Sequence, residues 1–145
     1  MRRLLACLSL VLLLSPMAGA ADAVFQSGGV AIKGYDPVAY FTLAVPTLGS
    51  EKFSHEWNGA NWQFSTQENR DLFAESPEQY APAYGGWCAY AMAQGSQASI
   101  DPEAFTLHEG RLFLNYSKRI EKKWRAKRDG YIQAADKKYP ELVSP

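Results

Sequence analysis

Residues 53–64 read FSHEWNGANWQF, two runs of alternating aromatic and polar residues joined by Asn58-Gly59. Asparagine followed by glycine readily adopts the positive φ angles of a tight turn, so this stretch predicts a β-hairpin. Residues 105–114 are organised in the same way around Glu109-Gly110 and predict a second hairpin. The two hairpins should therefore supply the main strands of the fold.

Capping residues indicate where helices should begin. Asp36 precedes Pro37, which predicts a helical turn, because aspartate caps free amides and proline is tolerated at the first helical position. Comparable capping signals occur at Ser65 or Thr66, at Ser76 and at Ser117. Gly85-Gly86 should end the helix that begins at Ser76 and precede a compact apolar helix over residues 87–94. These patterns predict an α+β fold, with one small antiparallel sheet built from the two β-hairpins and several short helices packed around it.

The composition is that of one ordinary globular domain. The 145 residues are 47% hydrophobic and 21% charged, which argues against a disordered, collagen-like or coiled-coil chain. Fifteen basic and fifteen acidic residues give a formal charge of zero, which argues against nucleic-acid binding, because proteins of that class are usually basic. Beyond the N-terminal region, no segment approaches the roughly 18 apolar residues of a membrane-spanning helix. We therefore expect no nucleic-acid partner and no transmembrane segment.

The N-terminal region has the pattern of a secretory signal peptide. Arg2-Arg3 precede an apolar run, and Ala18-Gly19-Ala20 offers the small residues of a cleavage site. We therefore expect a mature protein that is periplasmic or secreted. The residues that follow the cleavage site are small and polar, which is typical of a flexible leader. The expected divisions are a signal peptide over 1–20, a flexible leader over 21–29 and a single domain over 30–145.

Cys88 is the only cysteine outside the expected signal peptide, since Cys7 lies within it. A lone cysteine cannot form an internal disulfide, so Cys88 is an apolar core residue, an intermolecular link, a metal ligand or a reactive thiol. Because it follows Gly85-Gly86, it should occupy the first turn of a helix, where free backbone amides stabilise a thiolate. Thiol redox chemistry would need an external thiol or a redox partner protein, because the mature chain has no second cysteine.

Several motifs of the chain resemble the YHS domain family. They are residues 34–41 (GYDPVAYF), 64–73 (FSTQENRDLF), 77–80 (PEQY), 84–91 (YGGWCAYA), 101–104 (DPEA) and 112–116 (LFLNY). The resemblance is closest to exported members that carry cysteine or selenocysteine at the position of Cys88, which implies thiol redox chemistry there. Metal-binding members carry further cysteines at the positions of Ala39, Ser65 and Asn69. The resemblance therefore implies no thiolate metal site at those three positions.

Two alternatives to redox chemistry stay open. Cys88 and Met92 are four residues apart on the expected helix, so both sulfur atoms would lie on one face, and His55 or His108 would complete a copper site. The chain would otherwise be a non-catalytic interaction domain. Residues 118–128 hold seven basic residues and one acidic residue, a pattern that is usually a solvated helix face but also suits an anionic lipid or an acidic protein. Whether the chain is an enzyme stays open with these alternatives.

Overall fold

The structure is a computed structural model that describes residues 21–144, so the expected signal peptide lies outside the described residues. In chain order the elements are β1 (Gln26–Ser27), β2 (Val30–Ala31), the 3-10 turn η1 (Ile32–Gly34), α1 (Pro37–Thr42), β3 (Ser50–Trp57), β4 (Ala60–Phe64), α2 (Gln67–Glu75), α3 (Pro77–Tyr80), the 3-10 turn η2 (Ala83–Gly86), α4 (Ala89–Ala93), β5 (Asp101–His108), β6 (Arg111–Asn115), α5 (Lys118–Ala126) and α6 (Arg128–Val143). This mixture of helices and strands confirms the predicted α+β class.

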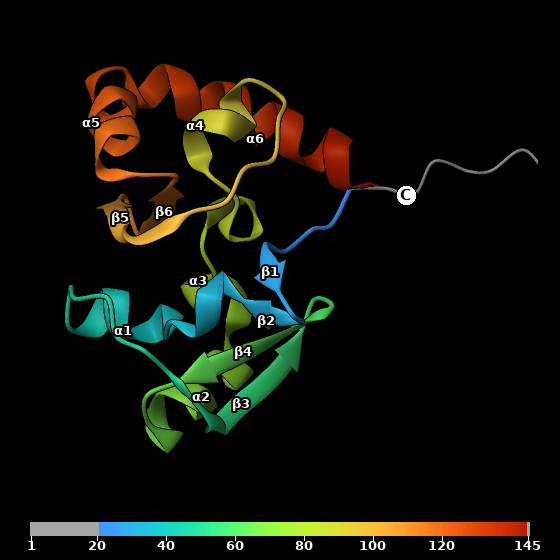
Figure 1. The fold of residues 1–145 in the computed structure, drawn as a ribbon, viewed down its shortest axis with the longest axis vertical. Helices are drawn as coiled ribbons and strands as arrows, with labels where there is room; N and C mark the ends of the chain where they lie inside the picture. The colour runs from blue at the N-terminus through green and yellow to red at the C-terminus, as the bar shows by residue number, and fades with distance from the viewer. Residues whose placement is uncertain (1–20, 145) are drawn as a thin grey trace, which may run out of the picture.

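The lower half of Figure 1, which we call the lower lobe, is built on the first hairpin and contains β1 to β4 with α1, α2 and α3. β3 and β4 pair antiparallel, and Asn58 and Gly59 have positive φ angles in the turn between them, as the sequence predicts. β2 pairs parallel with β4 and antiparallel with β1, so the sheet has the order β1-β2-β4-β3.

The upper half, which we call the upper lobe, contains the second hairpin with α4, α5 and α6 (Figure 1). β5 and β6 form a separate two-stranded sheet. This corrects the expectation that both hairpins share one antiparallel sheet. The short strand β2 pairs with the edge of β4 that the second hairpin would otherwise need. β6 does not join that sheet and is buried on both of its faces. The core consists of two hydrophobic clusters. Leu112 and Leu114 pack in the one that we call the lower hydrophobic cluster, which contains Trp62, Phe64 and Phe73. Phe113 packs in the upper hydrophobic cluster, which contains Met92 and Trp124.

The N-terminal segment 21–29 differs from the flexible leader that its composition suggested. Val24 and Phe25 are buried, and the amide of Phe25 donates to the carbonyl of Gly85 at 3.0 Å. Gly85 permits this approach, because a Cβ on that residue would lie 1.8 Å from the carbonyl oxygen of Ala23. The segment is ordered because its two apolar side chains fill the core and its backbone groups find partners there.

Asp36, Thr66 and Ser117 cap their helices as the sequence predicts, whereas Ser76 precedes α3 without a side-chain capping hydrogen bond. Asp36 accepts from the first amides of α1, and the side chain of Thr66 accepts from the amide of Asn69 at 3.1 Å. The hydroxyl of Ser117 accepts from the amide of Ile120 at 3.2 Å at the start of α5. Local rules therefore place the helix starts correctly, because each cap needs partners only two or three residues away.

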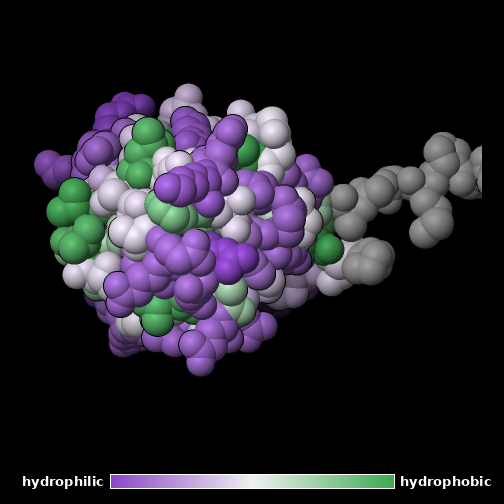
Figure 2. Space-filling model, turned by 90° about the horizontal axis from the view of Figure 1, so that it is seen from below, coloured by the Kyte–Doolittle hydropathy of each residue, from purple (hydrophilic) through white to green (hydrophobic). Residues whose placement is uncertain are grey.

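The lower end of the molecule is mostly hydrophilic, with apolar residues in small separate groups (Figure 2). Leu43, Val45 and Leu48 are exposed in the loop between α1 and β3. Among residues 21–144, no helix has the length and apolar character needed to span a bilayer.

Candidate functional site

Cys88 lies in the core of the protein. Only 1% of the residue is exposed, and its backbone has φ −52° and ψ 118°, so it precedes α4 and does not occupy the first turn as expected. Its Sγ atom donates a hydrogen bond to Oδ1 of Asn115 at 3.6 Å. The same oxygen accepts from the amide of Tyr90 at 3.0 Å, which sets the orientation of the carboxamide. The thiol hydrogen therefore has an acceptor within the core.

The four side chains expected to share a copper site do not come together. Cys88 packs in the lower hydrophobic cluster and Met92 in the upper one. Because Cys88 lies outside the helix, the four-residue spacing does not place both sulfur atoms on one face. His55 lies on β3 in the lower lobe, and His108 ends β5 in the upper lobe. Within the described part of the chain, no group of three or more histidine, cysteine or acidic residues is placed to hold a metal ion.

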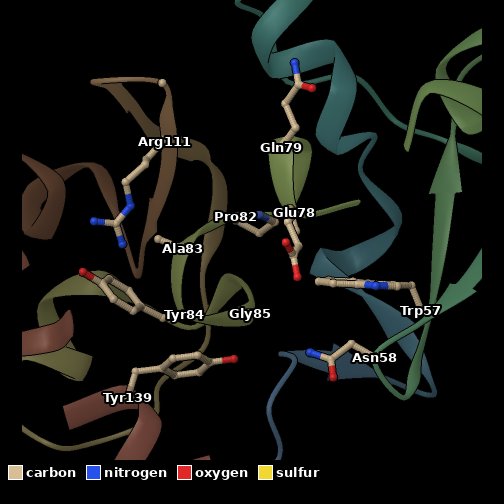
Figure 3. Close-up of a pocket in the computed structure, with 12 residues that line it drawn as sticks. Trp57, Asn58, Glu78, Gln79, Pro82, Ala83, Tyr84, Gly85, Arg111 and Tyr139 are labelled. Carbon is tan, nitrogen blue, oxygen red and sulfur yellow. The ribbon is translucent and has the colours of Figure 1, made fainter. Parts of the chain in front are cut away.

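A pocket of about 490 Å³ lies between the two lobes, where the ends of both hairpins face each other (Figure 3). This volume is in the usual range for pockets that bind small molecules. The side chains that matter for its chemistry are Trp57, Asn58, Glu78, Tyr84, Arg111 and Tyr139. We call it the hairpin pocket.

One wall of the hairpin pocket combines a carboxylate with an aromatic ring. Glu78 lies in the first turn of α3, and its carboxylate points into the pocket on the side of Trp57 (Figure 3). The ring of Trp57 is supported by Phe73 and Trp62, with centroids 5.7 and 6.0 Å away. Among residues 21–144, Glu78 forms no ion pair. The side chain of Asn58 extends toward the same space (Figure 3).

The opposite wall is a closed network of charged and polar groups. Arg111 donates two hydrogen bonds to Asp136, at 2.8 and 3.1 Å, and Tyr84 donates to the same carboxylate at 2.9 Å. The hydrogen bonds from Arg111 lower the pKa of Asp136, so this carboxylate stays ionised. Burial, followed by the hydrogen bond to Asp136, raises the pKa of Tyr84 well above its usual range. The charge of Arg111 is thus neutralised by Asp136, and Glu78 leaves the hairpin pocket with a net negative charge.

Two tyrosines complete this wall. Tyr139 donates its hydroxyl hydrogen to the carbonyl of Ala23 at 2.7 Å, so its oxygen, which points toward the centre of the pocket, is left to accept (Figure 3). Tyr84 has φ 60° and ψ 31°, a left-handed conformation that costs a non-glycine residue roughly 1–2 kcal/mol. Strained residues of this kind concentrate at functional sites. The hydrogen bond from Tyr84 to Asp136 helps to stabilise this strained conformation.

The sequence did not point to the hairpin pocket, because its walls come from both hairpins, α3, η2 and α6. Only the tertiary structure brings these parts of the chain together. One signal was available, since Trp57 is a large aromatic residue directly before the polar turn Asn58-Gly59. A tryptophan at the exposed end of a hairpin is a candidate binding residue.

Comparison of the chain with family models, with curated proteins and with solved structures finds no match. The resemblance to the YHS domain family therefore stays a prediction from the motifs.

Proposed function

We propose that the chain is an exported YHS-type domain that binds a small organic cation in the hairpin pocket. The observation that carries this proposal is the carboxylate of Glu78, which faces the pocket beside the ring of Trp57 without an ion-pair partner among the described residues.

The groups around the pocket match the needs of an ammonium ligand. The face of an indole attracts a cation by about 0.5–2 kcal/mol, depending on how far the site is shielded from water. Glu78 supplies the opposite charge, and the hydroxyl oxygen of Tyr139 supplies an acceptor. Arg111 would repel a cation if it were free, but its guanidinium is bound to Asp136 by two hydrogen bonds. An anionic ligand would meet the carboxylate of Glu78 and is disfavoured.

Export is part of the same proposal. The amide of Ala21 donates to the carbonyl of Leu142 at 3.2 Å, and the carbonyl of Asp22 accepts from the side chains of Trp87 and Gln97. Cleavage after Ala20 would therefore preserve all of these contacts. This agrees with the cleavage position that the sequence predicts.

Redox chemistry at Cys88 stays a prediction, and the structure offers less support for it. A substrate or partner thiol has to reach Sγ, which lies in the core and donates to Asn115. Copper binding is also less well supported, because the two sulfur residues Cys88 and Met92 pack in different clusters. The hairpin pocket, in contrast, is open to a ligand without any movement of the core.

The proposal is tested by calorimetric titration with choline and with 3,3-dimethylbutan-1-ol, which has the same shape without the charge. We expect choline to bind at least tenfold more tightly, because only the cation interacts with Trp57 and Glu78. Glu78→Gln should weaken choline binding by up to about fivefold, the upper end for a solvent-exposed charge pair, and leave the alcohol unaffected.

Glu75→Gln is the matched control, since Glu75 is exposed on α2 and does not line the pocket. It should leave choline binding unchanged. Equal affinity for choline and the alcohol, or equal loss in both glutamine variants, would contradict the proposal. Spermidine, a second organic cation, is titrated in the same way. If neither choline nor spermidine binds at about 10 mM, a concentration at which even a weak site would be partly occupied, the proposal is also contradicted.

A further inference from the structure

Charge is distributed very unevenly in this protein, and the hairpin pocket does not explain it. Residues 118–128 hold seven basic residues and one acidic residue, a net charge of +6. The remainder of the chain from residue 21 holds the other six basic and fourteen acidic residues, a net charge of −8. α5 lies at the upper end of the long axis in Figure 1, whereas β3 and α2, with five acidic residues over 51–75, lie at the lower end.

The packing of α5 fixes which of its faces is turned to solvent. Trp124 is fully buried, and Glu121 is almost fully buried. The carboxylate of Glu121 accepts from Thr106 and pairs with Arg125 at 2.7 Å. The side of α5 that carries Trp124 and Glu121 therefore packs against the core. The helix cannot rotate without breaking these contacts.

The outward face of α5 carries basic side chains that no carboxylate neutralises. Arg119, Lys122 and Lys123 are exposed and follow the three- and four-residue spacing of one helix face. None of the three forms an ion pair with another residue in 21–144. We call these three residues the basic face. A hollow of about 280 Å³ at the C-terminal end of the helix is lined by Arg125, Lys127 and Arg128 together with Asp129, which pairs with Arg128 at 3.5 Å.

Aromatic groups border the basic face. Tyr116, directly before the cap of α5, is 59% exposed. The ammonium group of Lys123 lies 4.9 Å from the ring centroid of Tyr90. Tyrosine is enriched at membrane–water interfaces, where its ring contacts the headgroup region and its hydroxyl stays hydrated.

We propose that the basic face of α5 docks on an anionic lipid bilayer. A stable protein interface needs a desolvated apolar centre, and this convex face has only charged side chains at its centre. Lipid headgroups need no such centre, because they rearrange around a convex surface and contribute mainly charge. The acidic lower lobe faces away from the bilayer, beyond the Debye length of about 8 Å at physiological salt, so its repulsion is screened.

Sedimentation with phosphatidylcholine vesicles, with or without 30% phosphatidylglycerol, tests this docking. The protein should bind the anionic vesicles and lose most of this binding at high salt. Each basic residue near an anionic surface contributes a factor of about five to the partition coefficient, so the triple variant Arg119→Gln, Lys122→Gln, Lys123→Gln should bind about 100-fold more weakly. All proteins compared carry the same N-terminus, so any contribution of residues 1–20 cancels.

The matched control removes three exposed lysines elsewhere, with Lys33→Gln, Lys52→Gln and Lys137→Gln. It has the same net charge as the triple variant and should keep most of the binding. Equal losses in both variants would show a response to net charge alone and would overturn the proposal. Failure to bind anionic vesicles at low salt would also overturn it. Tighter binding to a 20-residue polyglutamate or to an oligonucleotide than to the vesicles would assign the basic face to another partner.

Discussion

The carboxylate of Asp36 is fully buried and accepts five hydrogen bonds. Its Oδ1 atom accepts from the amides of Val38 and Ala39, which is the cap that the sequence predicts. Its Oδ2 atom accepts from Ser65 and Asn69, which lie 29 and 33 residues further along the chain. These two residues stand where the YHS resemblance places metal-binding cysteines. In this chain they join the starts of α1 and α2 through Asp36 and are not available as a ligand pair.

Cys88 makes the clearest single-residue prediction, because its burial and its hydrogen bond to Asn115 oppose modification. We expect the native protein to react with iodoacetamide at least 100-fold more slowly than the urea-unfolded protein, since the sulfur reacts only when the core opens. The rate is measured by mass spectrometry at pH 8. A Cys88→Ala, Gln94→Cys variant, with its cysteine at an exposed position, supplies the rate of an accessible thiol. Equal rates for native Cys88 and this control would restore the hypothesis of an accessible redox thiol.

η2 is the element that lets the two lobes meet. Tyr84 and Gly85 follow one another in the left-handed conformation, with φ 60° and 61°. This places the ring of Tyr84 on the hairpin pocket and the backbone of Gly85 against Ala23. The helix that the sequence predicts from Ser76 to the glycine pair ends earlier, because α3 stops at Tyr80 and the backbone of Ala81 and Pro82 is extended. The contact of η2 with the N-terminal segment joins Gly85 to Phe25, sixty residues away in sequence.

Replacement of Gly85 by alanine should destabilise the protein by about 3 kcal/mol or more, because the new Cβ would lie 1.8 Å from the carbonyl oxygen of Ala23. Gly59→Ala is the matched control, with φ 78° and no atom within 4 Å of its Cβ position. It should cost only the roughly 1–2 kcal/mol of left-handed backbone strain. Urea unfolding curves measure both variants. Equal costs would show that the N-terminal segment does not need its approach to Gly85.

At the scale of the whole molecule, the Arg111–Asp136 pair joins β6 to α6, and Tyr84 adds η2 to the same network. The pKa of Asp136 is lowered in the folded protein by its hydrogen bonds from Arg111. A lowered pKa means that the ionised form is favoured by folding. Its contribution to stability is therefore present above the usual aspartate pKa of 3.8 and is lost as the pH falls through the lowered value.

Asp136→Asn should therefore destabilise the protein most at neutral pH, and its difference from the wild-type protein should shrink as the pH falls below about 4. The effect should stay below about 1 kcal/mol, because both side chains are almost half exposed. Thermal unfolding of both proteins between pH 7 and pH 2.5 measures it, and the comparison removes the contributions of the other carboxylates. A difference that is constant with pH would show that ionisation of Asp136 does not stabilise the fold.

The sequence by itself determined the features that depend on neighbouring residues. Both hairpin turns, the capping residues Asp36 and Ser117 and the α+β class follow from turn and capping rules that operate over two to four residues. Only the tertiary structure decided the separation of the hairpins into two sheets, the packing of residues 21–29, the burial of Cys88 and the convergence of Trp57 and Glu78 on one pocket. These depend on which apolar surfaces meet. Many arrangements satisfy the same local pattern, and the free energy of burying the whole core selects among them.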